Sequence, residues 1–479
     1  MDMTASELCF LSAVTMRQMI LDGEISCLEL LEAHLAQQAR WNESVNAIIT
    51  HTDDQARQRA RQADQQLAAN EPLGLLHGLP VAHKDLAMTR GIRTTYGSPI
   101  FADFVPEQND LVIERLLEAG VVTIGKTNVP EFGAGSQTFN PVFGATRNPY
   151  DLSRTCGGSS GGAAVALACG MIPIADGSDM GGSLRNPANF CNVVGFRTSP
   201  GRVPIWPGET PWFPLGVQGP MARTVEDVAL LLQVMAGPDP RVPISIEQPG
   251  EMFAGSLQRD FQDVQVAFSL DLEGQIPVHT DVRETLAPAA GVLAGLGCEL
   301  EQDAPDFRDA DSIFKVFRAW RFAMKYGPLM DKHRAQMKDT VCWNVEQGLK
   351  LTGTQLAGAA RQRSVLLGRV HRFFQKYEFL VMPVSQVPPF DVGQPYVEQV
   401  EEVSMETYID WMQSCYFITV TGLPAISVPF GFTSDGLPVG IQVVGRHHDE
   451  WGVLQFAHAI QEATGAWRQA PAIAVDESN

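Results

Sequence analysis

The sequence predicts an α/β fold built on a largely parallel or mixed central sheet. Short apolar segments typical of buried strands alternate with segments of helical spacing through most of the chain. Of the 479 residues 45% are hydrophobic and 19% charged, which is ordinary globular composition with ample material for a large core. No repeat, linker or low-complexity tract divides the chain. We therefore expect one domain over residues 1–479.

The first elements are expected to be helices. Residues 5–70 look helical and polar, Ser26 and Glu29 form a capping-box pattern, and residues 53–69 predict a solvent-facing helix. Strands are then expected at residues 78–82, 121–124, 171–175 and 264–268. Helices between them are expected at residues 110–119, 160–169, 224–237 and 280–296. The end of the chain, residues 418–446, reads as strands joined by Gly/Pro turns.

Residues 305–375 differ from the rest of the chain. They are long, helical in spacing, and rich in aromatic, methionine and charged side chains. We expect them to form a helical cap inserted in the domain and packed over the sheet. Their aromatic residues include Phe314, Phe317, Trp320, Phe322 and Trp343.

The net charge of −20 excludes several classes of partner. It would repel phosphate backbones and anionic membrane surfaces, so we expect no nucleic-acid and no membrane partner. The eight cysteines form no CxxC pair, which disfavours a zinc knuckle or a redox dithiol and favours reduced, mostly buried thiols in a cytoplasmic protein. The N-terminus does not read as a signal peptide, and the longest apolar run, residues 163–175, is too short to span a bilayer.

Two Gly/Ser-rich segments stand out, residues 155–162 (TCGGSSGG) and residues 179–185 (DMGGSLR). Glycines permit tight turns and let backbone N–H groups approach a ligand closely. Serines supply hydroxyls that attack a carbonyl or relay a proton. The two segments lie about one helix and one strand apart, so they can converge on a single site.

One interpretation of these segments is a hydrolytic site in which a lysine activates a serine. Three other interpretations compete with it. A phosphate-binding loop would need the Gly-Lys-Ser/Thr ending, which is missing. An α/β-hydrolase fits the G-x-S-x-G pattern around Ser159, but it needs an acid and a late histidine. Its candidates, none in a convincing motif, are His447, His448 and His458. The third interpretation is a flexible connector, which is less natural for two segments that both lie in apolar sequence.

Lys84 is the candidate base for such a serine. It ends the apolar run of residues 79–83, and a lysine drawn into a core strand tends to lose its proton because burial disfavours the ammonium. A neutral lysine can accept a proton from a serine. Taken alone, Lys84 is more readily a strand-end lysine that faces water. The two serine segments are what favour the base.

These segments carry a close resemblance to a known family. Residues 78–85 (GLPVAHKD), 156–162 and 177–187 resemble the lysine motif and the Gly/Ser signature of the amidase signature family. The spacings agree, with 75 residues from Lys84 to Ser159 and 24 from Ser159 to Ser183. The resemblance also covers residues 125–128, 144–149 and 422–445 and is weakest between 240 and 410. It implies a mixed, twisted central sheet covered by helices on both faces, and chemistry without a metal or an organic cofactor.

The resemblance also implies roles for individual residues. Ser183 is the expected nucleophile, Lys84 the base, and Ser159, after a cis peptide bond with Gly158, the proton shuttle between them. The oxyanion hole is expected from the backbone N–H groups of Met180, Gly181, Gly182 and Ser183. Supporting roles fall to Ser160 and to an ion pair of Asp179 with Arg185. The loop that lines the acyl pocket is expected at Phe132, Gly133 and Ala134.

Two local features have plainer interpretations. His83 stands where the family often has an aliphatic residue, and we expect it to fill space rather than to tune Lys84. The run from His447 to Glu450 is expected to be a solvated polar loop and not a metal site.

The predicted function is hydrolysis of the C–N bond of hydrophobic or aryl amides, and of esters and carbamates (urethanes), through an acyl-enzyme on Ser183. The substrate is expected to be a small molecule and the protein a monomer or homodimer. Alternatives are a glutaminyl-tRNA amidotransferase A-like subunit, which needs a partner chain and an ammonia tunnel, an esterase using Ser159, and a non-enzymatic binding protein. An apolar funnel over Ser183 is expected from two aromatic groups, unless these only join the cap to the sheet: Trp206, Trp212 and Phe213, and Phe314, Phe317 and Trp320.

Overall fold

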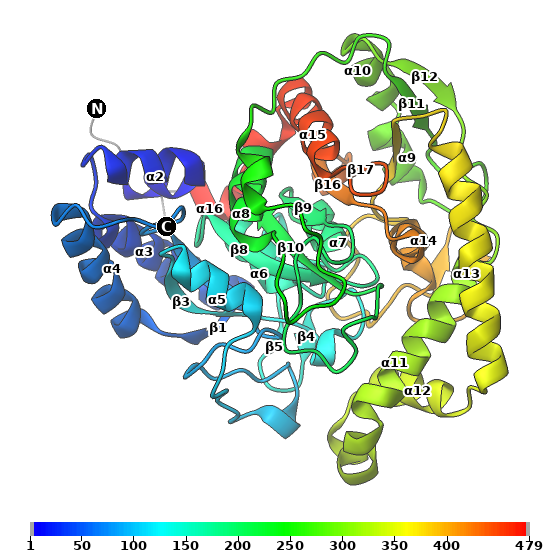
Figure 1. Cartoon of the computed structure of the whole chain (residues 1–479), viewed down its shortest axis with the longest axis horizontal. Coiled ribbons are helices and arrows are strands. Elements are labelled where there is room, and N and C mark those ends of the chain that lie inside the picture. The colour runs from blue at the N-terminus through cyan, green and yellow to red at the C-terminus, as the bar shows by residue number, and fades with distance from the viewer. Residues whose placement is uncertain (1–3, 476–479) are drawn as a thin grey trace.

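The computed structural model describes residues 4–475, and a mixed sheet of eleven strands runs through it (Figure 1). The strands of this sheet are β1 (Ile48–His51), β2 (Pro80–Lys84), β3 (Val122–Thr127), β8 (Ile174–Asp179), β9 (Val194–Arg197), β10 (Val217–Ala222), β11 (Gln265–Phe268), β12 (Glu299–Gln302), β13 (Phe379–Pro383), β16 (Ala425–Phe432) and β17 (Pro438–Val444). Their order is β1-β3-β2-β8-β10-β9-β16-β17-β13-β11-β12. Strand β2 pairs in parallel with β3 and β8, and β11 with β12 and β13, whereas the remaining pairs are antiparallel. The predicted α/β class is confirmed.

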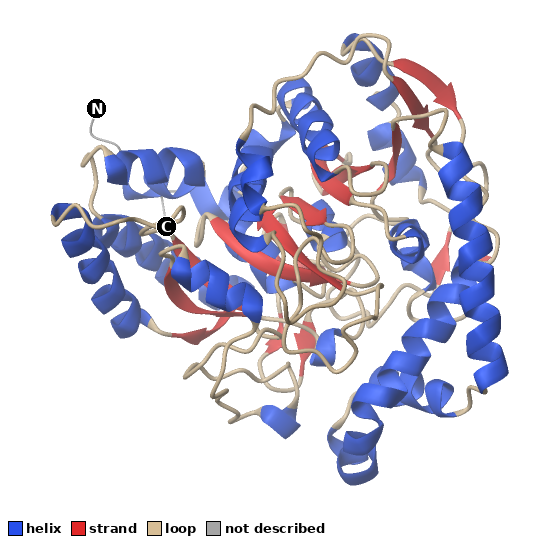
Figure 2. Ribbon diagram, viewed as in Figure 1, coloured by secondary structure: helices blue, strands red, loops and turns tan. Residues whose placement is uncertain are grey.

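Helices flank this sheet (Figure 2). They are α1 (Ala5–Phe10), α2 (Ala13–Leu21), α3 (Cys27–Val45), α4 (Asp53–Ala68), α5 (Leu111–Glu118), α6 (Gly161–Ala168), α7 (Arg185–Phe190), α8 (Val225–Met235), α9 (Thr280–Leu286), α10 (Ala289–Gly295), α11 (Ala310–His333), α12 (Asp339–Leu349), α13 (Gly353–Phe373), α14 (Gln413–Thr421), α15 (Glu450–Thr464) and α16 (Ala472–Val475). Short two-stranded ladders pair β4 (Phe139–Asn140) with β5 (Gly144–Ala145), β6 (Arg147–Asn148) with β7 (Asp151–Thr155), and β14 (Gln399–Val400) with β15 (Val403–Ser404). Within residues 4–475 no helix is long and apolar enough to cross a membrane.

Several predicted helices begin and end for the expected reasons. The Ser26 hydroxyl accepts a hydrogen bond from the Glu29 amide at the start of α3, and the Glu29 carboxylate accepts one from the Ser26 amide, so the capping box is formed. The side chain of Thr224 caps α8 in the same way. Helix α4 buries only small residues, Ala56, Ala60 and Ala63, which confirms that its other faces are turned to solvent.

Three segments differ from the predictions. Residues 48–51 form β1 within a stretch predicted to be helical, because this short apolar run pairs with β3 at the end of the sheet. The single helix predicted over 280–296 is two helices, since Pro288 lacks the amide that the continuing helix would need. Residues 418–421, predicted as part of a strand region, close the buried helix α14, which ends where Gly422 takes a left-handed conformation (φ 74°).

The strand predicted at 171–175 begins later and runs further than expected. Strand β8 starts at Ile174, directly after Pro173, and continues through Gly177 and Ser178 to Asp179, the first residue of the second Gly/Ser segment. Because β8 runs parallel to β2, the carboxyl ends of both strands lie at the same edge of the sheet. Lys84 ends β2 and Asp179 ends β8, so the two motifs meet there.

Residues 305–375 are helical as predicted, and they form α11, α12 and α13. Figure 1 shows α11 and α13 (yellow-green to yellow) side by side along one flank of the molecule. Helix α11 packs on α12, α13 and α14. Its Phe314 stacks on Tyr416 of α14, with ring centroids 4.4 Å apart. A second, smaller apolar cluster joins this region to the loop after β3, through Phe132, Phe322, Tyr326 and Val341.

Candidate active site

The Lys84 ammonium group lies at the centre of a cluster of hydroxyls. Its Nζ is 2.9 Å from the Ser159 Oγ, 2.7 Å from the Ser160 Oγ and 3.0 Å from the Ser178 Oγ. The carbonyl oxygen of Ser178 accepts a further hydrogen bond from it at 3.3 Å. Strand β2 therefore places the lysine against the first Gly/Ser segment and against Ser178, the residue directly before the second segment.

Burial makes Lys84 an unusual lysine. Its side chain is 1% exposed, and this burial lowers its pKa from 10.5 to about 7, although the carboxylates of Asp179 and Asp176 act in the opposite direction. A large fraction of the amine is then uncharged near neutral pH. The predicted alternative, a strand-end lysine that faces water, is wrong, because all five residues of β2 are buried.

The first Gly/Ser segment holds Ser159 in a defined position. The peptide bond between Gly158 and Ser159 is cis, as predicted. The Gly158 carbonyl accepts a hydrogen bond from the Ser136 hydroxyl at 2.6 Å, and that hydroxyl accepts one from the Asn186 amide group at 2.7 Å. The Ser160 hydroxyl contacts Lys84 and donates weakly to the Ser178 carbonyl at 3.5 Å.

Ser183 lies in the second segment, beside the first. Its carbonyl accepts a hydrogen bond from the Ser160 amide at 3.1 Å, which ties the two segments together. Ser159 and Ser183 both line the same cavity. In the part of the chain that the structure describes, the Ser183 hydroxyl makes no hydrogen bond, so it is free to meet a ligand.

Asp179 shapes the loop that carries Ser183. Its carboxylate accepts hydrogen bonds from the amides of Gly182 (3.0 Å) and Leu184 (3.1 Å), and from two guanidinium nitrogens of Arg185 (3.1 and 2.9 Å). Burial alone would raise the pKa of Asp179, but the charges of Arg185 and Arg197 outweigh it and hold the pKa well below its usual range. The predicted ion pair is present and fully buried.

The amide of Gly182 is therefore already engaged. Its φ of 109° is a glycine conformation, and a Cβ there would lie 2.6 Å from the Cβ of Cys415. Within residues 4–475 the amides of Met180, Gly181 and Ser183 donate to no other atom, and all three residues line the cavity. Three of the four predicted oxyanion donors are thus unoccupied.

A cavity of about 640 Å³ opens over these serines. It is bounded by the ends of β2 and β8, the loop of residues 200–218 and one side of α11. The cavity has several aromatic walls, which is typical of sites for small organic molecules. The aromatic residues that line it are Tyr96, Phe132, Trp206, Phe213, Phe322 and Tyr326.

The predicted aromatic funnel is only partly realised. Trp206 and Phe213 line the cavity as expected, but Trp212 is 68% exposed on the outside of its loop. Phe314 and Phe317 pack into the core instead, and Trp320 contacts the outer side of Phe213 with ring centroids 5.8 Å apart. The rings that do face the cavity from α11 are Phe322 and Tyr326, further along the helix.

The loop predicted to line the acyl pocket lies beside Ser159. Phe132 takes a left-handed conformation (φ 52°), lines the cavity and stacks on Tyr326 at 4.5 Å between ring centroids. Gly133 approaches so closely that a Cβ there would lie 3.4 Å from the Ser159 Oγ. Ala134 is fully buried and does not line the cavity.

His83 fills space with specific contacts. It is fully buried, its Nδ1 lies 2.7 Å from Asp176 Oδ1, and its Nε2 lies 3.0 Å from the Thr123 hydroxyl. The other Asp176 oxygen accepts a hydrogen bond from the Lys84 amide at 3.2 Å. His83 thus touches the backbone support of Lys84 and not its amine.

The late histidines lie away from the serines. His447 and His448 stack on each other before α15, and His458 bonds Glu226 at 2.9 Å. In residues 4–475 no histidine hydrogen-bonds Ser159 or Ser183, and no group of three His, Cys, Asp or Glu side chains is arranged to hold a metal. All eight cysteines are free and buried, as predicted.

Sequence reasoning missed three members of the site. Ser178 contacts Lys84, Arg197 donates to the Asp179 carboxylate at 3.3 Å, and Asp176 supports Lys84. Ser178 and Asp176 lie in or next to the second motif, so their position was the available signal. Arg197 had no such signal, because it stands in a later strand, β9.

Comparisons with known proteins agree with this geometry. The family model described as Amidase matches residues 29–454. The glutamyl-tRNA(Gln) amidotransferase A subunit of Geobacillus kaustophilus is 35% identical, over 94% of this chain and 96% of its own. An acylamidase of Rhodococcus erythropolis is 34% identical, over 97% of this chain and 98% of its own. The crystal structure of a bacterial aryl acylamidase of the amidase signature family superposes with a TM-score of 0.91 at 26% identity, over 98% of this chain and 99% of its own.

The family model matches most of the chain, and the relatives and the solved structure are similar to it along almost its full length. Together these matches identify the family of the protein. The α/β-hydrolase alternative is set aside by them, and so is a non-enzymatic binding protein. The chain belongs to the amidase family, as an amidase signature amidohydrolase that acts on carbon–nitrogen bonds other than peptide bonds.

Proposed function

We propose that this protein hydrolyses hydrophobic or aryl amides, and by the same route esters and carbamates, through an acyl-enzyme on Ser183. The observation that carries the proposal is the contact between the amine of Lys84 and the hydroxyl of Ser159. Lys84 is buried and has a pKa near 7, and Ser159 and Ser183 line the same cavity. An uncharged amine can serve as a base near neutral pH.

In the proposed mechanism Ser183 attacks the substrate carbonyl and passes its proton through Ser159 to Lys84. Lys84 then returns a proton by the same route to the departing amine, as the C–N bond breaks and an ester forms on Ser183. Water attacks this ester with Lys84 again as the base, which releases the acid and restores Ser183. Ser160 and Ser178 hold the amine in place through their hydroxyls.

The free amides of Met180, Gly181 and Ser183 are the proposed donors to the oxyanion. Each such donor contributes on the order of 2.7–4 kcal/mol to the stabilisation of the transition state. The Gly182 amide, which donates to Asp179, holds the loop in shape instead. Asp179, Arg185 and Arg197 act on the reaction through the shape of this loop, and the charge of Asp179 also raises the pKa of Lys84.

The aromatic walls support the substrate class. Phe132, Phe213, Phe322 and Tyr326 line the cavity and supply apolar contact area for an aryl or alkyl group. Burial of one such ring contributes roughly 1.5–3 kcal/mol to binding. The similarity to an acylamidase and to an aryl acylamidase points in the same direction.

An amidotransferase A-like subunit is the second candidate, because relatives of that description are about equally identical to this chain. That activity would use glutamine and a partner chain. Purified protein is to be compared on an aryl acylamide, an aryl carbamate and glutamine under the same conditions. We expect turnover of the aryl substrates; efficient glutamine turnover with little aryl activity would favour the amidotransferase.

The nucleophile is tested with Ser183→Ala. We expect it to lose nearly all hydrolysis while its circular dichroism spectrum stays unchanged, and mass spectrometry of the wild type with a slow aryl ester to find the acyl group on the peptide that contains Ser183. The paired Ser159→Ala variant is expected to retain an acylation site and to react more slowly. Retention of more than a few per cent of activity by Ser183→Ala would remove Ser183 from the role of nucleophile.

A further inference from the structure

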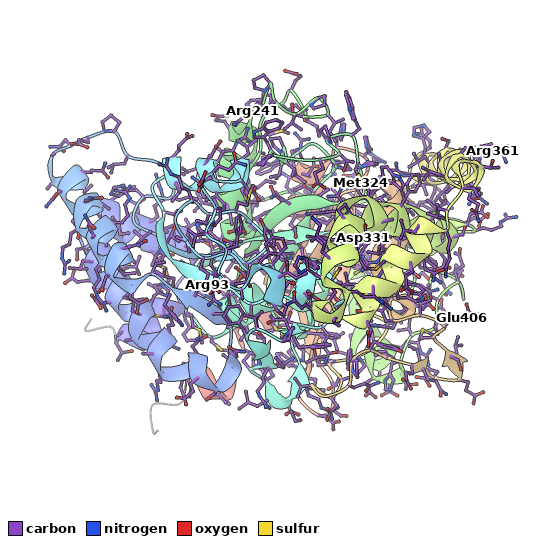
Figure 3. All side chains as sticks on the ribbon, turned by 90° about the horizontal axis from the view of Figure 1, so that it is seen from below. Arg93, Arg241, Met324, Asp331, Arg361 and Glu406 are labelled. Atoms are coloured by element: carbon purple, nitrogen blue, oxygen red, sulfur yellow. The ribbon has the colours of Figure 1, made fainter. Side chains whose placement is uncertain are left out.

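One side of α11 brings three basic residues to the wall of the active-site cavity. Arg318, Arg321 and Lys325 follow one another at intervals of three and four residues, so they lie along a single face of the helix, here called the α11 basic face. All three line the cavity. Figure 3 shows this helix at the near side of the molecule, with Met324 and Asp331 labelled on it. Such a face is unexpected in a chain with a net charge of −20.

Arg318 is buried with most of its hydrogen-bonding capacity unused. It is 5% exposed, and its one hydrogen bond runs from Nη2 to the Tyr408 hydroxyl at 2.6 Å. Its Nε is buried without a partner. The guanidinium stacks over the ring of Phe322 at 4.5 Å, which fixes its plane. A guanidinium carries five N–H donors, so several donors of Arg318 lack a protein partner within residues 4–475.

Arg321 is held in the same way, one turn further on. Its Nη1 donates to the Thr210 hydroxyl at 2.5 Å, and its guanidinium lies over the ring of Phe213 at 4.8 Å. Burial lowers the pKa of Arg321. Among residues 4–475 no carboxylate lies within 4.0 Å of a guanidinium nitrogen of Arg318 or Arg321.

Among residues 4–475 three of the other four buried arginines are paired with carboxylates, and the fourth, Arg223, donates its hydrogen bonds to four backbone carbonyls. Arg185 and Arg197 share the carboxylate of Asp179, and Arg202 pairs with Glu450 at 2.8 Å. A buried cation without a counter-ion is costly, so natural proteins pair it or use it. Among the described residues Arg318 has neither a carboxylate nor a set of backbone carbonyls as acceptors, and this difference points to a ligand.

Three carboxylates also line the cavity, and none of them pairs directly with Arg318 or Arg321. Asp179 is already paired with Arg185 and Arg197. Burial raises the pKa of Asp110 to about 7, and Asp110 accepts its hydrogen bond from the Met88 amide. Glu209 lies exposed on the loop beside Thr210. The two arginines of the α11 basic face therefore have no carboxylate in direct contact among the described residues, although the charge of Glu209 acts on Arg321 and that of Asp110 on Lys325 from a distance.

The helix also sets the distance of this face from the reacting carbonyl. Phe314 touches the proposed oxyanion loop, because a Cβ on Gly181 would lie 3.3 Å from its Cζ. An α-helix rises about 1.5 Å per residue. Arg318 therefore lies roughly 6 Å beyond Phe314 along the helix axis, and Arg321 lies roughly 10 Å beyond Phe314. A group bound by the two arginines would thus stand several bonds from the scissile amide.

We propose that Arg318 and Arg321 form a subsite for a carboxylate on the substrate, remote from the amide that is cleaved. The two oxygens of a carboxylate match the forked donors of a guanidinium. The preferred substrates are then aryl amides whose acyl chain ends in a carboxylate, such as half-amides of dicarboxylic acids. This inference rests on the proposed amidase function and narrows its substrate class.

The test compares the mono-4-nitroanilide of adipic acid with its methyl ester, which removes the charge and keeps the chain. Release of 4-nitroaniline is followed for the wild type, Arg318→Gln and Arg318→Lys. We expect the wild type to have a kcat/KM about tenfold or more higher for the acid than for the ester, the size of a charge-assisted hydrogen bond. Arg318→Gln is expected to bring this ratio close to one, and Arg318→Lys to leave it between the two.

The matched control is Arg361→Gln. Arg361 is exposed on α13, at the outer edge of the molecule in Figure 3, and we expect the ratio of the wild type in this variant. Circular dichroism spectra check that each variant is folded. A ratio near one in the wild type, or a ratio that survives Arg318→Gln, would overturn the subsite while the amidase function stands.

Binding separates the subsite from the amidase function. Calorimetry with Ser183→Ala measures the affinity of the acid and of the ester without turnover. If the wild type hydrolyses neither compound, the proposed function fails for this class, and the subsite is decided by binding alone. The subsite is supported if Ser183→Ala binds the acid more tightly than the ester and if the double variant Ser183→Ala/Arg318→Gln loses this difference. It is refuted if Ser183→Ala binds the two compounds equally or binds neither.

Discussion

Replacing Lys84 with methionine is expected to abolish hydrolysis and to stabilise the fold at neutral pH. Burial lowers the pKa of Lys84 from 10.5 to about 7. At about 1.36 kcal/mol per pKa unit, and with half of the amine already neutral at pH 7, folding this lysine costs about 4 kcal/mol relative to a lysine that stays in water. Methionine has a similar length and no charge, so its burial avoids that cost.

Methionine also loses contacts. The amine touches the hydroxyls of Ser159, Ser160 and Ser178, and at about 1 kcal/mol each these hydrogen bonds offset about 3 kcal/mol of the gain. The variant should therefore be about 1 kcal/mol more stable than the wild type at pH 7. The pKa of Lys84 is lower in the folded than in the unfolded chain, so the cost of burying the lysine falls as pH rises from 7 toward 10.5. The advantage of methionine should disappear by about pH 9.

The measurement is urea unfolding at pH 7 and pH 9, followed by tryptophan fluorescence. Lys350→Met, at an exposed position directly after α12, is the control, and it should show no such change between the two pH values. If Lys84→Met were less stable than the wild type by the same amount at both pH values, Lys84 would not be a buried amine of lowered pKa. The assignment of a neutral base would then lose its support.

Three further predictions concern the same site. The kcat/KM for a neutral aryl amide should fall about tenfold per pH unit below pH 7, because the fraction of neutral Lys84 falls as the proton concentration rises; a flat profile between pH 5 and 7 would contradict the assignment. Incubation with EDTA should leave the rate unchanged, and a loss restored by a divalent ion would show that a metal takes part. Asp179→Asn should destabilise the protein by about 3–5 kcal/mol, because Arg185 and Arg197 would lose their buried counter-ion; a melting temperature equal to that of the wild type would argue against this pairing.

The catalytic candidates could be predicted from the sequence because their signals are local. Lys84 ends a run of apolar residues, and Ser159 and Ser183 lie in glycine-rich segments whose conformation few other residues could adopt. The parallel pairing of β2 with β8 then brings Lys84 to these segments, and no local signal predicts this pairing, because α5, β3 and α6 separate the two strands along the chain.

The cavity wall could not be predicted as well, because it depends on helical phase. Phe314 and Phe322 stand two turns apart on α11, and only the packing on α14 decides that the first is core and the second is lining. Trp212 and Phe213 are adjacent in sequence, yet one is exposed and the other faces the cavity. Composition and periodicity predict neither the orientation of a loop nor the rotation of a helix relative to its neighbours.

Arg185 links the loop that carries Ser183 to a much later part of the chain. Its guanidinium donates to the side chains of Thr419 (3.1 Å) and Gln442 (2.7 Å) and to the carbonyl of Cys415 (3.0 Å). During synthesis Lys84 and both serines exist long before residue 442 does, and until then this cation has no complete shell of acceptors. An incomplete chain would carry the reactive groups without the loop geometry that makes them useful. The geometry of the loop that carries Ser183 is therefore complete only once the strand that contains Gln442 has formed.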